Sequence, residues 1–262
     1  MTARQHDSTT ARLHDSKKRL DVVLVERGLA EDSKRAAAII LSGVVLVDEQ
    51  RVDKAGMLID STSEVRIKGS EQQYVSRAGF KLEGALRQFA LQVRGKVCVD
   101  LGASTGGFTD CLLQQGATKV YAFDVGRGQL HWDLQQDTRV VVRDSTNVRH
   151  LTRAMVEDPV DLITVDLAFI SLRLIFPCLK QFPSAEIIAL VKPQFEARRD
   201  EVPAGGIIHD KELQEDIVGR VKGFAASEGF SLLGEMASAL QGRKGNQEYF
   251  LYLKNVSGSA GG

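Results

Sequence analysis

The chain has 262 residues, which is enough for one large domain or for a small domain joined to a medium-sized one. Lysine plus arginine equals aspartate plus glutamate, at 34 each, so the net charge indicates no polyanionic partner and any nucleic-acid contact has to come from a local patch. With 43% apolar and 26% charged residues, the composition is that of a globular protein that can bury a core.

The cysteines and the two ends of the chain give further expectations. Cys98, Cys111 and Cys178 lie in apolar stretches without paired or metal-ligand spacing, which is typical of a reducing compartment and argues against a metal site. No apolar run reaches the length of a membrane span, and residues 1–18 contain no apolar signal core. We therefore expect a cytoplasmic protein with polar tails at residues 1–18 and 256–262, without a membrane partner.

Residues 19–72 read as a small unit of two helices followed by short strands. "RLDVVLVERGL" has apolar residues at helical spacing and stops at Gly28. "DSKRAAAIILSG" predicts a second helix, with Asp32 or Ser33 as its N-cap and Gly43 as its end. "VVLVDEQRV" and "EVRIKG" then predict short strands around turns.

The second predicted helix begins with two cations, Lys34 and Arg35. This is an unfavourable position, because the positive end of the helix dipole prefers carboxylates. Contact with phosphate is one explanation for the pair, and a solvated helix end is the other.

From residue 97 onward, apolar strand segments alternate with helical ones: "KVCVDLG", "KVYAFDV", "RVVVRD", "VDLITVDLAF" and "EIIALVKP", with "EYFLYLKN" able to complete the sheet. This alternation predicts βα units and a parallel sheet. Ligands of open α/β sheets bind outside the carboxyl ends of the strands. The charged residues expected at that edge are Asp100, Asp124, Asp144, Asp166 and Lys192.

The segment "VDLGASTGGFTD" places an acid, Asp100, beside a glycine-containing turn between a strand and a helix. Gly102, Gly106 and Gly107 permit tight turning and close approach of a ligand to the backbone. The pattern is D-x-G-x-x-x-G and not the G-x-G-x-x-G of dinucleotide sites. A carboxylate here favours a ligand with an ammonium and a sulfonium, such as S-adenosylmethionine, over a pyrophosphate.

Two further acids follow the next two strands. Asp124 is positioned to accept hydrogen bonds from ribose hydroxyls, and Asp144 to accept one from an adenine amino group. Either acid alone would be better explained as a cap or turn residue. The candidate cofactor-binding residues are Asp100, Gly102, Ala103, Ser104, Gly106, Gly107, Phe108, Asp124, Asp144 and Asp166.

Five motifs in order, "YVSRAGFKLEGAL", "VDLGASTGGFTDCLL", "VDLAFISL", "ALVKPQFE" and "GNQEYFLYL", resemble the TlyA family of ribosomal RNA 2′-O-methyltransferases, often labelled haemolysins. The resemblance implies an α/β fold with a Rossmann-like, FtsJ/RrmJ-like methyltransferase sheet over residues 81–255. It also implies a small N-terminal α+β S4-like RNA-binding domain over residues 19–72 and a linker at 73–80. The implied cofactor is S-adenosyl-L-methionine, and the implied partner is ribosomal RNA, within ribosomal subunits.

The resemblance further implies a catalytic Lys-Asp-Lys-Glu tetrad formed by Lys81, Asp166, Lys192 and Glu248. A ribose 2′-hydroxyl is a poor nucleophile, so a side chain must take or stabilise its proton. A lysine can do this in its neutral form, which burial and a neighbouring cation favour. We assign deprotonation to Lys192, its orientation to Asp166, and positioning of the hydroxyl to Lys81 and Glu248.

Five residues are candidates for RNA contact: Arg19, Lys34, Arg35, Arg77 and Phe169. Phe169, three residues after Asp166, can stack on the target base or on the cofactor adenine, or can be a core aromatic. Arg77 can contact RNA or fix the angle between the domains. The S4-like segment has acids in "VVLVDEQRV" where such domains often carry Asn-Gly, which weakens the expected turn.

Three other functions were considered. An NAD-dependent oxidoreductase would share the sheet and the glycine loop but would not need two lysines and two acids in this order. A non-catalytic S4-type RNA-binding protein would leave the strand-end charges unexplained. A membrane-lytic protein would need a membrane segment or a strongly amphipathic cationic helix, and the sequence has neither. The sequence therefore predicts an rRNA (cytidine-2′-O)-methyltransferase, with cytidine taken from the resemblance.

Overall fold

The computed structural model describes residues 17–60, 63–67, 73–242 and 244–256. The chain divides into two compact units, Met1–Glu71 and Gln72–Gly262. Of the predicted tails, residues 1–16 and 257–262 lie outside the described residues.

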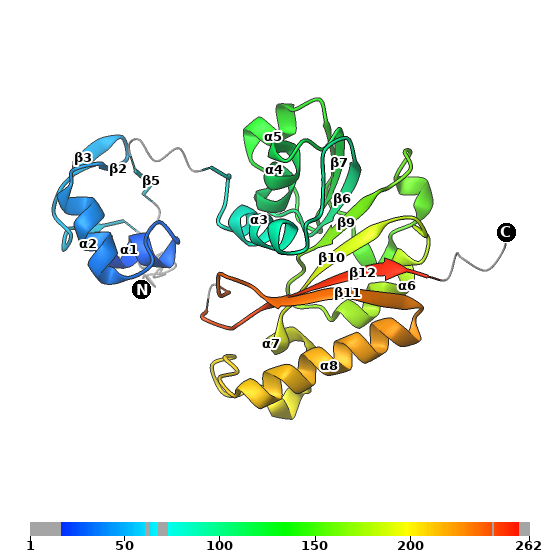
Figure 1. Ribbon diagram of the computed structural model, residues 1–262. Helices are drawn as coiled ribbons and strands as arrows, with labels where there is room; N and C mark the ends of the chain where they lie inside the picture. The colour runs from blue at the N-terminus through cyan, green and yellow to red at the C-terminus, as the bar shows by residue number, and fades with distance from the viewer. Residues whose placement is uncertain (1–16, 61–62, 68–72, 243, 257–262) are drawn as a thin grey trace, which may run out of the picture. The chain divides into compact units, whose positions relative to one another are not determined.

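The N-terminal unit contains two helices that pack on short strands (Figure 1). Its elements are β1 (Lys18–Arg19), α1 (Leu20–Glu26), α2 (Ser33–Leu41), β2 (Val45–Val47), β3 (Gln50–Val52), β4 (Leu58–Ile59) and β5 (Val65–Ile67). Strand β1 pairs with β4, and the other three form an antiparallel sheet in the order β3-β2-β5. Leu20 and Leu24 of α1 and Ile40 of α2 are completely buried in the core of this unit.

Local sequence explains where these elements begin and turn. The Asp32 carboxylate accepts the Arg35 backbone N–H at 2.7 Å, so Asp32 is the N-cap of α2. The β2–β3 hairpin forms in spite of its acidic turn, with Asp48 and Glu49 both at positive φ, 48° and 65°. Asp48 accepts the Glu64 N–H at 2.8 Å, and Glu49 is paired with Arg66. These partners stabilise a turn that usually takes Asn-Gly.

The C-terminal unit is built on a seven-stranded sheet in the order β11-β12-β10-β9-β6-β7-β8. Its strands are β6 (Val97–Leu101), β7 (Lys119–Phe123), β8 (Val140–Arg143), β9 (Leu162–Val165), β10 (Glu186–Val191), β11 (Phe230–Ala237) and β12 (Tyr249–Asn255). The five strands from β6 to β10 are parallel, and β12 runs antiparallel to both of its neighbours. The predicted parallel sheet is confirmed, whereas β11 was not predicted.

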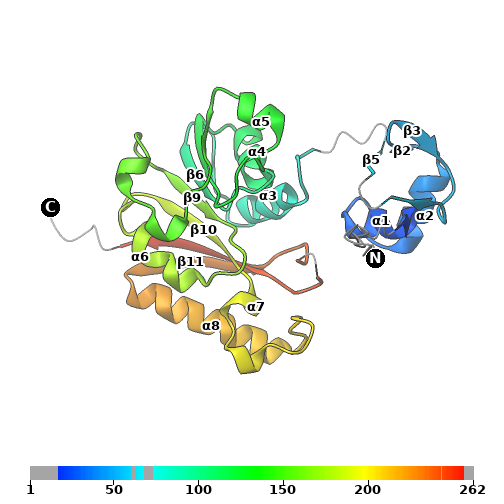
Figure 2. The same cartoon turned by 180° about the vertical axis from the view of Figure 1, so that it is seen from behind.

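Helices cover both faces of this sheet (Figures 1 and 2). The α-helices are α3 (Ala78–Gln88), α4 (Gly107–Gln114), α5 (Trp132–Gln136), α6 (Phe176–Leu179), α7 (Pro193–Glu196) and α8 (Lys211–Ser227). Short 3₁₀ helices span Val148–His150, Arg153–Met155, Leu172–Leu174 and Arg199–Glu201. Helices α3 and α4 pack on one face, and α6 and α8 pack on the other. The two faces therefore bury two separate apolar clusters.

The segment predicted as a linker, residues 73–80, is instead part of the C-terminal unit. Tyr74 is buried in the cluster formed with α3 and α4, and the Val75 N–H donates to the Asp110 carboxylate at 2.7 Å. Gly79 lies so close to Tyr74 that a Cβ would stand 2.3 Å from its ring. The division between the units falls before Gln72 because this aromatic anchors the chain to the sheet unit.

The strand order reverses between β6 and β9, since β6 continues to β7 and β8 on one side while β9 and β10 lie on the other. In open α/β sheets, the carboxyl ends of the strands at such a switch point form the ligand site. Among the described residues, no helix is long and apolar enough to span a membrane.

Candidate active site

The first ion pair of the site joins the ends of two adjacent parallel strands. Asp166 follows β9 and Lys192 follows β10. The Lys192 Nζ lies 2.5 Å from the Asp166 Oδ1, with only 14% of the lysine side chain and 18% of the aspartate side chain exposed. Pro193 begins α7 directly after the lysine, so the strand ends here and leaves Lys192 at the edge of the sheet.

A second and more deeply buried pair lies at the same edge. Lys81 on α3 donates to Glu248 at 2.5 Å, and 7% and 4% of their side chains are exposed. Glu248 directly precedes β12, whose Tyr249 pairs with Val191 of β10. Because β10 and β12 are antiparallel, this register puts Glu248 opposite Lys192. The four residues expected as a tetrad thus form two lysine–carboxylate pairs on neighbouring elements.

The position of Glu248 depends on residues that sequence reasoning missed. A Cβ on Gly242 would stand 2.5 Å from the Glu248 Oε1, so the glycine leaves room for this carboxylate. Asn246 is buried, accepts the Ile208 N–H at 3.0 Å and donates to the Gly206 carbonyl at 2.9 Å. Asn246 lies within the segment "GNQEY" and Gly242 lies shortly before it, and this segment was the available signal.

The glycine loop after β6 brings the ends of β6 and β9 together. Gly102 has φ +90°, and a Cβ there would stand 2.4 Å from the Asp166 carbonyl oxygen. Gly106 has φ +101°, and a Cβ there would meet Leu134 at 2.3 Å. Only glycine allows both the positive φ and this approach. The loop is thereby held directly beside the Lys192–Asp166 pair.

Asp100 lies completely buried beneath this loop. Its two carboxylate oxygens accept hydrogen bonds from the Thr109 hydroxyl at 2.7 Å and the Thr164 hydroxyl at 3.0 Å. Burial raises the pKa of Asp100 to about 6, the threonine hydrogen bonds oppose this rise, and the charge of Asp166 adds to it. Asp100 is therefore an internal support of the loop with a partly suppressed charge.

The two acids after the next strands organise backbone turns. Asp124 accepts the Ser104 N–H at 2.8 Å and the Gly126 N–H at 2.7 Å, one on each carboxylate oxygen. Asp144 accepts the Gly128 N–H at 2.7 Å. Each carboxylate oxygen can accept a second hydrogen bond, so both acids retain acceptor capacity for a ligand.

Three of the predicted cofactor-binding residues point into the protein interior. Ala103 is buried, and the Phe108 ring lies 6.2 Å from the Phe250 ring. A Cβ on Gly107 would stand 2.2 Å from the Ser76 Oγ, so this glycine permits the close packing of α4 against the start of α3. A ligand could reach these residues only through their backbone atoms.

Phe169 is not a core aromatic, because 89% of the residue is exposed. Its backbone has φ 63°, a conformation that bulky residues rarely adopt. Its ring lies 4.9 Å from the ring of Phe195 on α7. The exposed ring is therefore held on the segment that follows Asp166, next to the helix that follows Lys192.

The basic RNA candidates differ in their surroundings. Lys34 and Arg35 are exposed in the first turn of α2, as predicted. Arg19 is paired with Asp21 through two hydrogen bonds of 2.7 and 3.1 Å. Arg77 directly precedes α3 and is half-buried.

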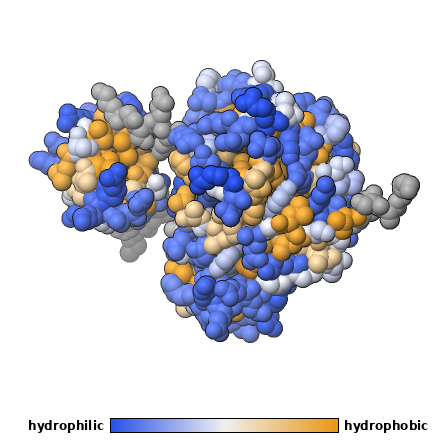
Figure 3. Space-filling model, in the orientation of Figure 1, coloured by the Kyte–Doolittle hydropathy of each residue, from blue (hydrophilic) through white to orange (hydrophobic). Residues whose placement is uncertain are grey.

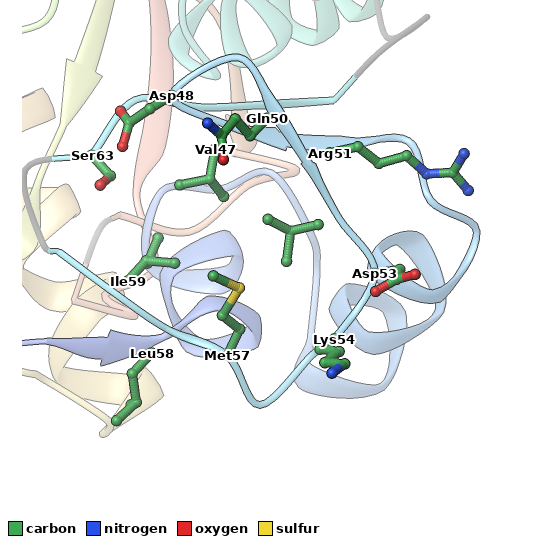
Figure 4. A pocket seen from close by; sticks show the side chains of 11 residues that line it. Val47, Asp48, Gln50, Arg51, Asp53, Lys54, Met57, Leu58, Ile59 and Ser63 are labelled. Carbon is green, nitrogen blue, oxygen red and sulfur yellow. The ribbon is translucent and has the colours of Figure 1, made fainter.

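The N-terminal unit also contains a cavity of about 520 Å³ (Figure 4), whose lining includes Val47, Val52, Met57 and Ile59. In the close view Val47, Met57 and Ile59 point toward one another, whereas Arg51 points away. Figure 3 shows apolar residues on one face of this unit among charged ones. The cavity is not lined by any residue expected to contact RNA.

Comparison with known proteins identifies the family. Residues 74–255 match the FtsJ-like methyltransferases, and residues 18–65 match the S4 domain. The chain belongs to the FtsJ-like methyltransferase family. It is therefore a methyltransferase that carries an S4 domain.

Individual relatives cover nearly the whole chain. A candidate rRNA methyltransferase of Bacillus subtilis, YqxC, is 47% identical over 240 residues, which are 90% of this chain and 85% of the relative. The 16S/23S rRNA (cytidine-2′-O)-methyltransferase TlyA of Mycobacterium tuberculosis is 45% identical over 245 residues, 92% of this chain and 91% of the relative. A solved structure from Streptococcus thermophilus, described as a candidate hemolysin, superposes with a TM-score of 0.77 at 40% identity and covers 93% of this chain and 90% of its own.

Proposed function

We propose that this methyltransferase transfers a methyl group from S-adenosylmethionine to the ribose 2′-hydroxyl of a cytidine in ribosomal RNA. The observation that carries the proposal is the presence of two lysine–carboxylate contacts beside the glycine loop, the partly buried Lys192–Asp166 and the buried Lys81–Glu248. The printed function of the Mycobacterium tuberculosis relative supports the choice of ribose and cytidine.

The chemistry of the strand ends fits S-adenosylmethionine. Asp124, Asp144 and Asp166 give this edge three carboxylates, and the loop at 101–107 contains no lysine or arginine. Such a set favours an ammonium and a sulfonium over a pyrophosphate. Asp124 and the backbone of the glycine loop would hold the cofactor, with Asp144 near its adenine. When bound, the cofactor supplies an electrophilic methyl group.

The chain's own residues then have separate roles. The neutral amine form of Lys192 takes the proton of the attacking 2′-hydroxyl and becomes an ammonium, and Asp166 keeps the lysine Nζ in place through the 2.5 Å contact. Lys81 and Glu248, which have little freedom because they are buried against each other, position the hydroxyl. Fixed geometry of this kind contributes to the rate because the reacting groups need not be ordered during the reaction.

The S4 domain and the exposed Phe169 ring fit a structured RNA substrate. Sequence-selective RNA readers stack unpaired bases on aromatic side chains. Phe169, three residues from Asp166, would stack on the base of the nucleotide whose ribose is methylated. Lys34 and Arg35 would contact phosphates. The natural substrates would be ribosomal subunits in the cytoplasm.

The test is transfer of labelled methyl from S-adenosylmethionine to ribosomal subunits that lack the modification. Wild type is compared with Lys192→Ala and with Lys96→Ala. Lys96 is a matched control because it makes a 2.5 Å pair with Glu186 at the opposite end of β10. We expect incorporation by wild type and by Lys96→Ala and none by Lys192→Ala. Binding of the cofactor without incorporation into either subunit would contradict the proposed acceptor.

A further inference from the structure

The two segments that carry Asp166 and Lys192 are joined a second time, at a buried carboxylate. Glu196 is the last residue of α7, and its side chain is almost completely buried. Its Oε2 accepts the Ser171 hydroxyl at 2.6 Å, and its Oε1 accepts the Leu172 N–H at 2.7 Å. Glu196 therefore ties the helix after β10 to the segment after β9.

Glu196 is a buried carboxyl group with several hydrogen-bond partners. Burial raises the pKa of its carboxyl, while the bonds from Ser171 and Leu172 and the charge of Arg173 lower it. Arg173 also donates to the Glu196 carbonyl oxygen at 3.0 Å. An acid is costly to bury unless it is hydrogen-bonded. Glu196 and Ser171 share the N-terminus of the following 3₁₀ helix: Glu196 accepts the Leu172 N–H, and the Ser171 hydroxyl accepts the Arg173 N–H at 3.2 Å.

Phe169 lies between the two attachment points. On one side Asp166 contacts Lys192 at 2.5 Å, and on the other Ser171 is bound to Glu196. The positive φ of Phe169, 63°, is a strained conformation for an aromatic residue. Such strain persists only where neighbouring contacts fix the backbone from several sides. Among the described residues the exposed ring has one aromatic partner, Phe195 on the same α7 as Glu196.

We propose that Glu196 is a positioning residue for the methyl-transfer site: it fixes the segment 167–172 against α7 and so presents the Phe169 ring to the target nucleotide. This inference rests on the proposed function. Glu196 touches neither cofactor nor substrate and acts through Phe169. Its loss should weaken productive RNA binding and leave cofactor binding unchanged.

The first test is hydrogen exchange on the full-length protein. Glu196→Gln keeps the shape of the side chain but replaces one of the two acceptors. We expect backbone exchange in the peptide 167–172 to become about tenfold faster, because its opening costs less. Glu235→Gln is the matched control. Glu235 lies on the half-exposed outer strand β11 and makes a 2.7 Å pair with Lys222 of α8. Unchanged exchange at 167–172, or faster exchange throughout the protein, would overturn the proposal.

The second test is a double-mutant cycle on methyl transfer to ribosomal subunits. Glu196→Gln should raise the KM for the subunit by about tenfold in the wild-type background and change it little in a Phe169→Ala background. Equal losses in both backgrounds would show that Glu196 does not act through Phe169 and would overturn the positioning role. Cofactor affinity, measured by calorimetry, should stay unchanged.

The two tests separate the inference from the proposed function. The hydrogen exchange result does not depend on any enzymatic activity. If wild type transfers no methyl group to RNA while Glu196→Gln loosens 167–172 selectively, the proposed function fails and the anchoring role of Glu196 stands.

Discussion

The central sheet has two edges formed by strand ends, one amino-terminal and one carboxyl-terminal. Each holds an ion pair of the same length, but the surroundings of the two pairs differ greatly. At the amino-terminal end of β10, Lys96 and Glu186 lie 2.5 Å apart with 23% and 25% of their side chains exposed. At the carboxyl-terminal end, Lys192 and Asp166 lie equally close. There the pair adjoins a glycine loop, a second buried pair and the strained Phe169.

The comparison shows that distance alone does not distinguish a structural pair from the pair that we propose to be catalytic. A single lysine–carboxylate contact fastens two elements together. Burial of a second pair and backbone strain cost free energy, and they are concentrated at one edge of the sheet. Functional sites are where such costs accumulate, which supports our proposal that the active site lies at the carboxyl-terminal edge.

The largest expected effect concerns activity. Replacing Lys192 by alanine should lower methyl transfer by about 10² to 10⁴-fold, the usual contribution of a positioned proton acceptor. Replacing Lys96 by alanine should leave the rate within about threefold of wild type, because its pair lies at the other edge. The measurement is the initial rate of label incorporation. Similar losses in the two variants would abolish the functional distinction between the edges.

The next effect concerns stability. Lys81→Ala leaves the buried Glu248 carboxylate without its partner, which should cost about 3 to 5 kcal/mol of unfolding free energy. Lys96→Ala should cost about 1 kcal/mol or less, since its pair is partly solvated. Denaturant unfolding at neutral pH measures both. A smaller loss for Lys81→Ala than for Lys96→Ala would show that the deeper pair is not the stronger one.

The buried acid beneath the catalytic edge predicts a pH dependence. The pKa of Asp100 is raised to about 6 from 3.8, so the native protein binds an extra proton between about pH 4 and 6. The stability contribution of this group therefore falls as the pH rises through that window, by roughly 3 kcal/mol at most. Asp100→Asn should remove this part of the slope in unfolding curves between pH 4 and 7. Equal slopes for wild type and variant would argue against a raised pKa.

The smallest expected effect concerns backbone strain in the N-terminal unit, which contains neither of the two ion pairs. Glu49 has the same left-handed backbone as Phe169 but lies in the β2–β3 hairpin. Glu49→Gly should relieve this strain and lose the exposed pair with Arg66, leaving thermal stability slightly raised or unchanged. A large drop in the unfolding midpoint would show that the side chain, and not the backbone, determines this turn.

Much of the fold could be predicted from apolar runs. Each strand from β6 to β10 coincides with a short, mainly apolar segment between turn signals, and such segments are typical of parallel sheets. Strand β11 was not predicted because it is the outermost strand of the sheet. Its residues are mostly exposed or half-exposed, and its pairing has a register shift between Leu232 and Gly234. The linker at 73–80 was misplaced because the burial of Tyr74 depends on packing against α4, which is distant from it in sequence.

The site shows a similar division. Charges at the strand ends could be located by spacing, since strand ends in a parallel sheet share an edge. The pairing of Lys81 with Glu248, 167 residues away, and the buried role of Glu196 depend on tertiary packing, which spacing does not encode. Ala103, Gly107 and Phe108 were assigned to the cofactor from their motif. In the structure, their Cβ positions point into the packed interior of the protein.

The most direct measurement locates the transferred methyl group. Ribosomal RNA treated with wild type or with Lys192→Ala would be digested to nucleosides and analysed by mass spectrometry. We expect 2′-O-methylcytidine with wild type and its absence with the variant. A methyl group on a base, or 2′-O-methylcytidine formed equally by Lys192→Ala, would contradict a ribose methyltransferase that works through the Lys192–Asp166 pair.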